Sequence, residues 1–112
     1  MYFIKEDHDD VVVEIVDLSR ATVNEAKEFV ETLEKDLDSG YKKIVADLSA
    51  CEFIDSTFLG TLVISLKKVT SAGGDLRLVG FQPAVHTMFD LTRMYRVFDT
   101  FDNKEDAINS FK

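Results

Sequence analysis

Cysteine, proline and basic residues are scarce in this sequence, and each shortage narrows the kinds of protein that it encodes. The only cysteine, Cys51, has no partner for a disulfide within the chain, which indicates a reducing, cytoplasmic setting. Only 13 Lys and Arg stand against 21 Asp and Glu, and they are scattered. Nucleic-acid binders cluster basic residues to displace counterions from phosphates. With a net charge of −8, we expect neither a nucleic acid nor an anionic membrane as partner.

Long apolar runs are also missing. No stretch of 18 apolar residues occurs, so we expect no membrane span. The first ten residues, MYFIKEDHDD, turn acidic after the fourth and lack the apolar stretch of a signal peptide. No internal repeat or linker is visible, and the only proline is Pro83. A chain of 112 residues with 46% hydrophobic content therefore indicates one domain over residues 1–112 with a single core.

Short β-branched runs alternate with segments of helical periodicity. This pattern predicts strands over residues 1–5, 11–16, 43–48, 76–81 and 96–98, with residues 6–10 as the first turn. Helices are expected after the Thr22–Glu25 capping box, after Asp55 or Ser56, from Pro83, and after Asn103. The order β-β-α-β-α-β-α-β-α predicts an α/β fold with a small mixed, mainly parallel sheet of about five strands and about four helices. Periodicity alone leaves open whether the helices cover one face of the sheet or both.

The stretch CEFIDSTFLG, residues 51–60, places three polar residues between two apolar runs, where a strand ends and a helix begins. Functional groups of open α/β sheets collect at the carboxyl ends of strands. One interpretation is that Asp55 or Ser56 is simply the N-cap of the helix. The other is that Ser56 carries a phosphate, because the free amides and the dipole at a helix start favour negative charge. A phosphate beside Asp55 would repel a closely packed partner.

Other chemistries find less support in the residues. Ser56 as a nucleophile needs a base, and neither His8 nor His86 is placed by a motif. The glycine spacing of a nucleophile elbow is absent around Ser56. A two-component receiver would carry its acidic pair after the first strand, whereas Asp9 and Asp10 precede the strand at residues 11–16. A nucleotide- or metabolite-binding domain is disfavoured because no phosphate-cradling loop occurs. We predict no catalytic activity, no metal and no cofactor.

The residues around Ser56 resemble the signature of the STAS domain, which occurs in bacterial anti-sigma factor antagonists. The family pattern is approximately two apolar residues followed by Asp-Ser-Ser/Thr-Gly-Leu-Gly, and residues 53–60 read FIDSTFLG. Residues 71–79, SAGGDLRLV, are similar to the family's glycine pair before its next strand. Residues 83–92 are similar to its third helix. The order of elements also matches along the whole chain.

The resemblance implies a binding module that is switched by phosphorylation. In this family the unphosphorylated antagonist binds an anti-sigma factor that is also a GHKL-type serine/threonine kinase, and this frees the sigma factor. The kinase then phosphorylates the serine after the aspartate, the antagonist is released, and a PP2C-type phosphatase resets it. Carried over, Ser56 is the phospho-acceptor, with Thr57 as the fallback. Asp55 would hold the loop or orient the hydroxyl.

Two departures from the family pattern concern the partner surface. Phe58 stands where the family has glycine, so its ring either contacts a partner or fills the core. Residues 16–21, VDLSRA, lack the family's Gly-x-apolar-Asp. The predicted partner-contact residues are Ser19, Arg20, Asp55, Ser56, Thr57 and Phe58. The alternative is a STAS scaffold or a subunit of a signalling or transport complex in which Ser56 is no switch.

Overall fold

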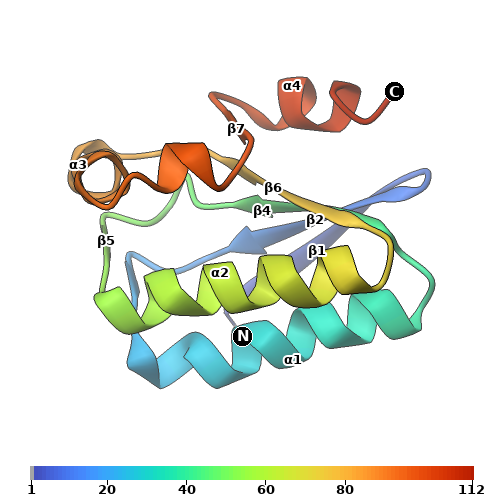
Figure 1. Ribbon diagram of the computed structural model, residues 1–112, viewed down its shortest axis with the longest axis horizontal. Helices are drawn as coiled ribbons and strands as arrows, with labels where there is room; N and C mark the ends of the chain where they lie inside the picture. The colour runs from blue at the N-terminus through green and yellow to red at the C-terminus, as the bar shows by residue number, and fades with distance from the viewer. Residues whose placement is uncertain (1) are drawn as a thin grey trace.

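The computed structural model describes residues 2–112, which form an α/β fold around a five-stranded mixed sheet (Figure 1). The strands lie in the order β1-β2-β4-β6-β7. They are β1 (Phe3–His8), β2 (Val11–Val16), β4 (Lys43–Asp47), β6 (Asp75–Val79) and β7 (Thr100–Phe101). The edge strand β1 is antiparallel to β2, and the remaining neighbours are parallel. The predicted fold class and mixed sheet are therefore confirmed.

Helices cover both faces of this sheet. In the described residues they are α1 (Val23–Asp38), α2 (Ser56–Ser71), α3 (Pro83–Leu91) and α4 (Lys104–Asn109), with a short 3₁₀ helix η1 (Met94–Arg96) after α3. α1 and α2 lie side by side on one face, and α4 lies on the other (Figure 1). No helix among residues 2–112 is both long and apolar enough to cross a membrane. The question that periodicity left open is thus answered in favour of two covered faces.

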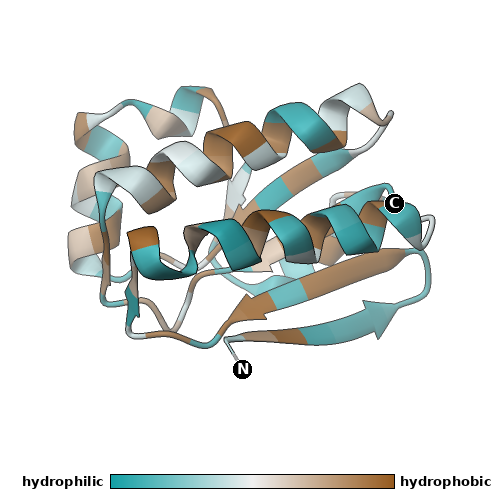
Figure 2. Cartoon of the chain, turned by 90° about the horizontal axis from the view of Figure 1, so that it is seen from below, coloured by the Kyte–Doolittle hydropathy of each residue, from teal (hydrophilic) through white to brown (hydrophobic). Residues whose placement is uncertain are grey.

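Two hydrophobic clusters correspond to these two layers. The larger one joins the sheet to α1, α2 and α3, and the smaller one places Ala107 of α4 against Val13, Val45 and Val79. Figure 2 looks onto the layer of α1 and α2 and shows that α1 is the more hydrophilic of the two helices. Along β2, Val12 and Val16 belong to the larger cluster, whereas Val11 and Val13 belong to the smaller one, as expected from the two-residue period of a strand.

The predicted helix starts are confirmed by their hydrogen bonds. Thr22 caps α1, and its backbone amide donates to Glu25 Oε1 at 3.0 Å, which completes the capping box. Pro83 is the first residue of α3, where a missing amide proton costs nothing. Asn103 Oδ1 accepts the amide of Asp106 at 2.9 Å and caps α4. Local sequence chemistry thus determines where these helices begin.

The first hairpin is longer than the sequence pattern predicts. A strand over residues 1–5 and a turn over residues 6–10 were expected, but β1 continues to His8 and pairs with β2 throughout. Residue 1 lies outside the described residues. Only Asp9 and Asp10 remain for the turn, and Asp9 has φ of 61°, a left-handed conformation that Asp tolerates well. The charged residues here belong to an edge strand, where polar side chains reach water.

The predicted strand over residues 96–98 is wrong. η1 occupies Met94–Arg96, and the strand that completes the sheet is β7, Thr100–Phe101. Arg93 adopts φ of 59° and turns the chain after α3. Phe98 is buried in the main core, so its apolar character reflects packing rather than strand pairing. Sequence patterns did not predict a further two-stranded parallel sheet of β3 (Arg20–Ala21) and β5 (Phe53–Ile54).

Candidate functional site

The pairing of β3 with β5 brings the starts of two helices together. Ser19 O accepts the amides of Glu52 and Phe53 at 2.7 and 3.1 Å, and Ala21 O accepts the amide of Asp55 at 3.2 Å. β3 leads directly into α1, and β5 leads directly into α2. Because the two strands are parallel, both helices begin at the same end of the molecule (Figure 1). This short sheet therefore builds a surface with two adjacent helix N-termini.

Asp55 joins these two N-termini through its carboxylate. Oδ1 accepts the amide of Phe58 at 2.8 Å, which makes Asp55 the N-cap of α2. Oδ2 accepts the amide of Val23, the first residue of α1, at 3.0 Å. Of the two N-caps that the sequence allowed, the structure selects Asp55. The carboxylate satisfies one free amide of each helix and fixes the two helices to one another.

Ser56 takes no part in this capping. It is the first residue of α2, its side chain is exposed, and its hydroxyl has no hydrogen-bond partner within residues 2–112. Thr57, the second residue of α2, is also exposed. The amides of these two residues have no acceptor in the described part of the chain, as is usual for the first turn of a helix. An exposed hydroxyl thus stands beside free backbone donors.

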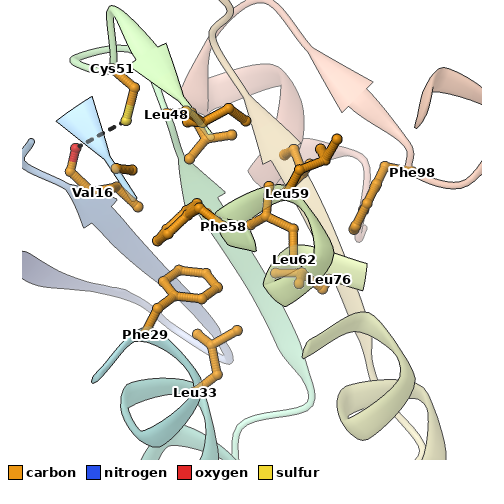
Figure 3. Close-up of a cluster of buried hydrophobic side chains, with 14 of the residues drawn as sticks. Val16, Phe29, Leu33, Leu48, Cys51, Phe58, Leu59, Leu62, Leu76 and Phe98 are labelled. Atoms are coloured by element: carbon orange, nitrogen blue, oxygen red, sulfur yellow. Dashed lines mark hydrogen bonds between the residues drawn. The ribbon is translucent and has the colours of Figure 1, made fainter. Parts of the chain in front are cut away.

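Phe58 lies beneath this surface and is fully buried. Its ring centroid is 5.3 Å from that of Phe29 on α1, with the ring planes tilted by 53°, and Figure 3 shows the two rings next to one another. Of the two roles that the sequence left open, the structure therefore shows the core. The ring supports the start of α2 and is not accessible to a partner in this conformation. Phe29 was not predicted, although it lies three residues after Ala26 and four before Leu33, the helical spacing of the buried face of α1.

Ser19 and Arg20 lie beside the segment that leads into Asp55, because Ser19 O accepts the amides of Glu52 and Phe53 and Arg20 pairs with Phe53. Both are exposed, and the Arg20 guanidinium carbon is 4.4 Å from the centroid of the Phe53 ring. This contact is a cation–π interaction across β3 and β5. Val23, which is 59% exposed, borders the same surface and was not predicted. Its only signal in the sequence is its position directly after the Thr22 cap.

Cys51 and the histidines do not contribute a nucleophile or a base to this surface. Cys51 is fully buried, and burial raises the pKa of its thiol to about 12 (Figure 3). Cys51 is thus a small apolar residue of the main core. His8 contacts Glu6 on β1, and His86 packs against Tyr95. Neither histidine has a hydrogen bond to Ser56 in the described residues.

These observations define a small α/β domain with an exposed serine at the paired starts of two helices. Comparison with known proteins identifies its family, since the STAS domain matches residues 4–107. A Thermotoga neapolitana protein with the provisional name of anti-sigma factor antagonist is 38% identical over 72 residues, which are 64% of this chain and 64% of that protein. The match therefore spans less than two thirds of this relative. The chain belongs to the STAS domain family.

Solved structures agree with this assignment. The crystal structure of a provisionally named anti-sigma factor antagonist from Thermotoga maritima is 31% identical, with a TM-score of 0.86 over 96% of this chain and 92% of that one. The crystal structure of an anti-sigma factor antagonist from Mycobacterium paratuberculosis is 26% identical, with a TM-score of 0.84 over 96% of this chain and 91% of that one. The fold predicted from the resemblance is thus shown.

Proposed function

We propose that this protein is an anti-sigma factor antagonist whose binding is switched by phosphorylation of Ser56. The main support for the proposal is that Asp55, and not Ser56, caps α2. The hydroxyl of Ser56 is exposed and has no hydrogen-bond partner among the described residues, so capping does not explain a serine at this position. The names of its STAS relatives support the role of antagonist.

The proposed phosphate would suit this position without unfolding the domain. The unpaired amides of Ser56 and Thr57 and the dipole of α2 favour negative charge. The phosphate would add about −1.5 to −2 charges beside the Asp55 carboxylate. A partner packed against Ser56 would then lose affinity through repulsion and desolvation. A loss of about 2.7 kcal/mol corresponds to roughly 100-fold in Kd.

The proposed partner is an anti-sigma factor that is also a GHKL-type serine/threonine kinase. It would bind the unphosphorylated surface formed by the exposed or half-exposed residues Ser19, Arg20, Asp55, Ser56 and Thr57. Phe58 is buried and would not contact the partner. It would instead hold the first turn of α2 in place from within the core. A PP2C-type phosphatase would restore the binding form. The protein would act in this cycle by binding and as a substrate.

Paired affinity capture from the native cells tests this proposal. Ser56→Ala and Ser56→Asp serve as baits, and bound proteins are identified by mass. We expect the Ala bait to retain an anti-sigma factor kinase that the Asp bait loses. Ser71→Ala and Ser71→Asp are the matched controls, because Ser71 is exposed at the other end of α2, and both should retain the kinase. Thr57→Ala and Thr57→Asp baits test the fallback site. Identical partners on both Ser56 baits would overturn the switch and favour a constitutive scaffold. Discrimination at position 57 instead would assign the phosphate to Thr57.

A further inference from the structure

Two carboxyl groups are buried at the opposite end of α1 from Asp55. Glu14 lies in the middle of β2 and is 1% exposed, and Asp36 lies in the last turn of α1 and is 0% exposed. Glu and Asp are almost never fully buried unless they are paired. Glu14 shares its face of β2 with Val12 and Val16, which belong to the main core, and Asp36 approaches from α1. Neither residue takes part in the Ser56 surface.

The hydrogen-bond partners of this pair are too few for two negative charges. Lys5 Nζ lies 2.8 Å from Asp36 Oδ1, so one positive charge faces the pair. Glu14 Oε2 and Asp36 Oδ2 have no hydrogen-bond partner among the described residues. A buried carboxylate without a partner costs several kcal/mol. One proton between the two carboxyl groups would leave a single negative charge to balance Lys5.

The cross-strand partners of Glu14 add no second cation to Lys5. β1 contributes Lys5, which is the cross-strand partner of Glu14, and Asp7, which accepts a hydrogen bond from the Tyr41 hydroxyl. β4 places Ala46 opposite Glu14, and alanine does not titrate. No group of three His, Cys, Asp or Glu residues that could hold a metal ion occurs in residues 2–112. A proton is therefore the ligand that the geometry accommodates.

We propose that Glu14 and Asp36 share one proton, and that this shared proton, called the latch below, holds the C-terminal half of α1 against β2. The protonated carboxyl donates to the ionised one, which satisfies both otherwise unpartnered oxygens. Loss of the proton would leave two buried negative charges against one lysine. The last turns of α1 would then separate from the sheet more readily, while the Asp55 end of the helix would keep its own contacts.

The pKa of Glu14 agrees with this arrangement. Burial, followed by the neighbouring Asp36, raises it from 4.5 to about 9. The folded state therefore holds a proton that the unfolded chain releases above about pH 4.5. Stability from the latch is complete below that pH and declines as the pH rises toward about 9. One bound proton corresponds to a rise of about tenfold in the unfolding constant for each pH unit within this window.

Glu14→Gln isolates this effect, because glutamine keeps the shape and the donor but does not titrate. We expect the unfolding constant of the wild type, relative to Glu14→Gln, to rise about 100-fold between pH 6 and pH 8, so that the variant becomes the more stable protein at alkaline pH. Glu28→Gln is the matched control, because Glu28 is exposed on the same helix. It should follow the wild type at every pH. Parallel curves for the wild type and Glu14→Gln would overturn the proposal.

Infrared spectroscopy of the wild type tests the latch even if the variant does not fold. With ¹³C at the glutamate carboxyls, a protonated glutamate band should be present at pH 7 and disappear as the pH passes about 9. Hydrogen exchange at the same pH values should show protection lost first in the C-terminal half of α1. Absence of the protonated band at pH 7 would overturn the proposal, as would uniform loss of protection along α1.

Discussion

The two ends of α1 hold carboxylates in opposite ways. At the start of the helix, Asp55 accepts backbone amides from Val23 and Phe58 and lies within reach of water. At its end, Glu14 and Asp36 are sealed beneath the helix, with Lys5 as the one cation in contact. Backbone donors at a helix start stabilise the ionised form, whereas burial without donors favours the protonated form. The same functional group thus meets backbone donors at one end of the helix and a donor-poor interior at the other.

The two ends of α1 should therefore differ in how well they tolerate an added negative charge such as a phosphate. The Asp55 end has further free amides at Ser56 and Thr57, so added negative charge there would not destabilise the fold. Additional charge at the Glu14 end would oppose folding. A phosphate is therefore compatible with the first end alone.

Phe58→Ala should have the largest effect, because Phe58 supports the Asp55 end from within the core. Deleting a fully buried phenylalanine that packs on Phe29 should lower the free energy of unfolding by about 3–5 kcal/mol. Urea denaturation measures the change. Leu91→Ala is the control, because Leu91 is 80% exposed and should cost less than about 0.5 kcal/mol. A cost below about 1 kcal/mol for Phe58→Ala would show that the ring does not support this end.

Asp55→Ala should cost about 1–2 kcal/mol, since it removes the cap of α2 and the bond to Val23. Asp55→Asn should fall between the wild type and the alanine variant, because its single carbonyl oxygen retains one of the two acceptors. Amide exchange at Val23 and Phe58 would identify which bond is kept. Equal stability of the alanine variant and the wild type would contradict the bridging role of Asp55.

Arg20→Ala should cost about 0.5–1 kcal/mol through loss of the contact with the Phe53 ring. Arg20→Lys keeps the charge but loses the planar stacking, so we expect a smaller cost. Thermal unfolding of the two variants in parallel separates charge from stacking. If alanine at position 20 is as stable as the wild type, the guanidinium is free for a partner and contributes nothing to the β3–β5 pair.

Ser56→Ala should have the smallest effect on stability, within about 0.5 kcal/mol of the wild type. The reason is that the hydroxyl has no hydrogen-bond partner in the described residues. Chemical denaturation of Ser56→Ala and Asp55→Ala in parallel compares the free energy of unfolding lost at a non-capping residue with that lost at a capping residue. A cost above about 1 kcal/mol would return Ser56 to the role of a structural cap.

Local features of the fold were predictable from the sequence, and long-range ones were not. The capping box at Thr22, Pro83 at a helix start and the Asn103 cap depend on neighbouring residues, and they are confirmed. The β3–β5 pair joins segments about thirty residues apart and has only two residues in each strand. The position of β7 depends on the turn at Arg93, whose left-handed conformation leaves no pattern in the sequence.

In the candidate site and in the buried carboxyl pair, features set by neighbouring residues were likewise easier to predict than features set by long-range contacts. The exposure of Ser56 follows from its place at a helix start, which the pattern of residues 51–60 predicts. The second bond of Asp55, to Val23, depends on two helices meeting in space. The burial of Glu14 had a signal in the sequence, a single charged residue inside the run VVVEIV at residues 11–16. The burial of Asp36 had only a positional signal. Asp36 lies three residues after Leu33 on the buried face of α1, but charged residues at the end of a helix are usually solvated.

Mass spectrometry of the wild type and Ser56→Ala, after incubation with ATP and the captured anti-sigma factor, would show whether Ser56 is the phosphorylation site that controls binding. The Kd of the phosphorylated product for the anti-sigma factor is measured alongside. We expect one phosphate on Ser56, none on the variant, and a Kd that rises by roughly 100-fold. Phosphate at another residue, or unchanged affinity with Ser56 phosphorylated, would contradict the proposed role of Ser56.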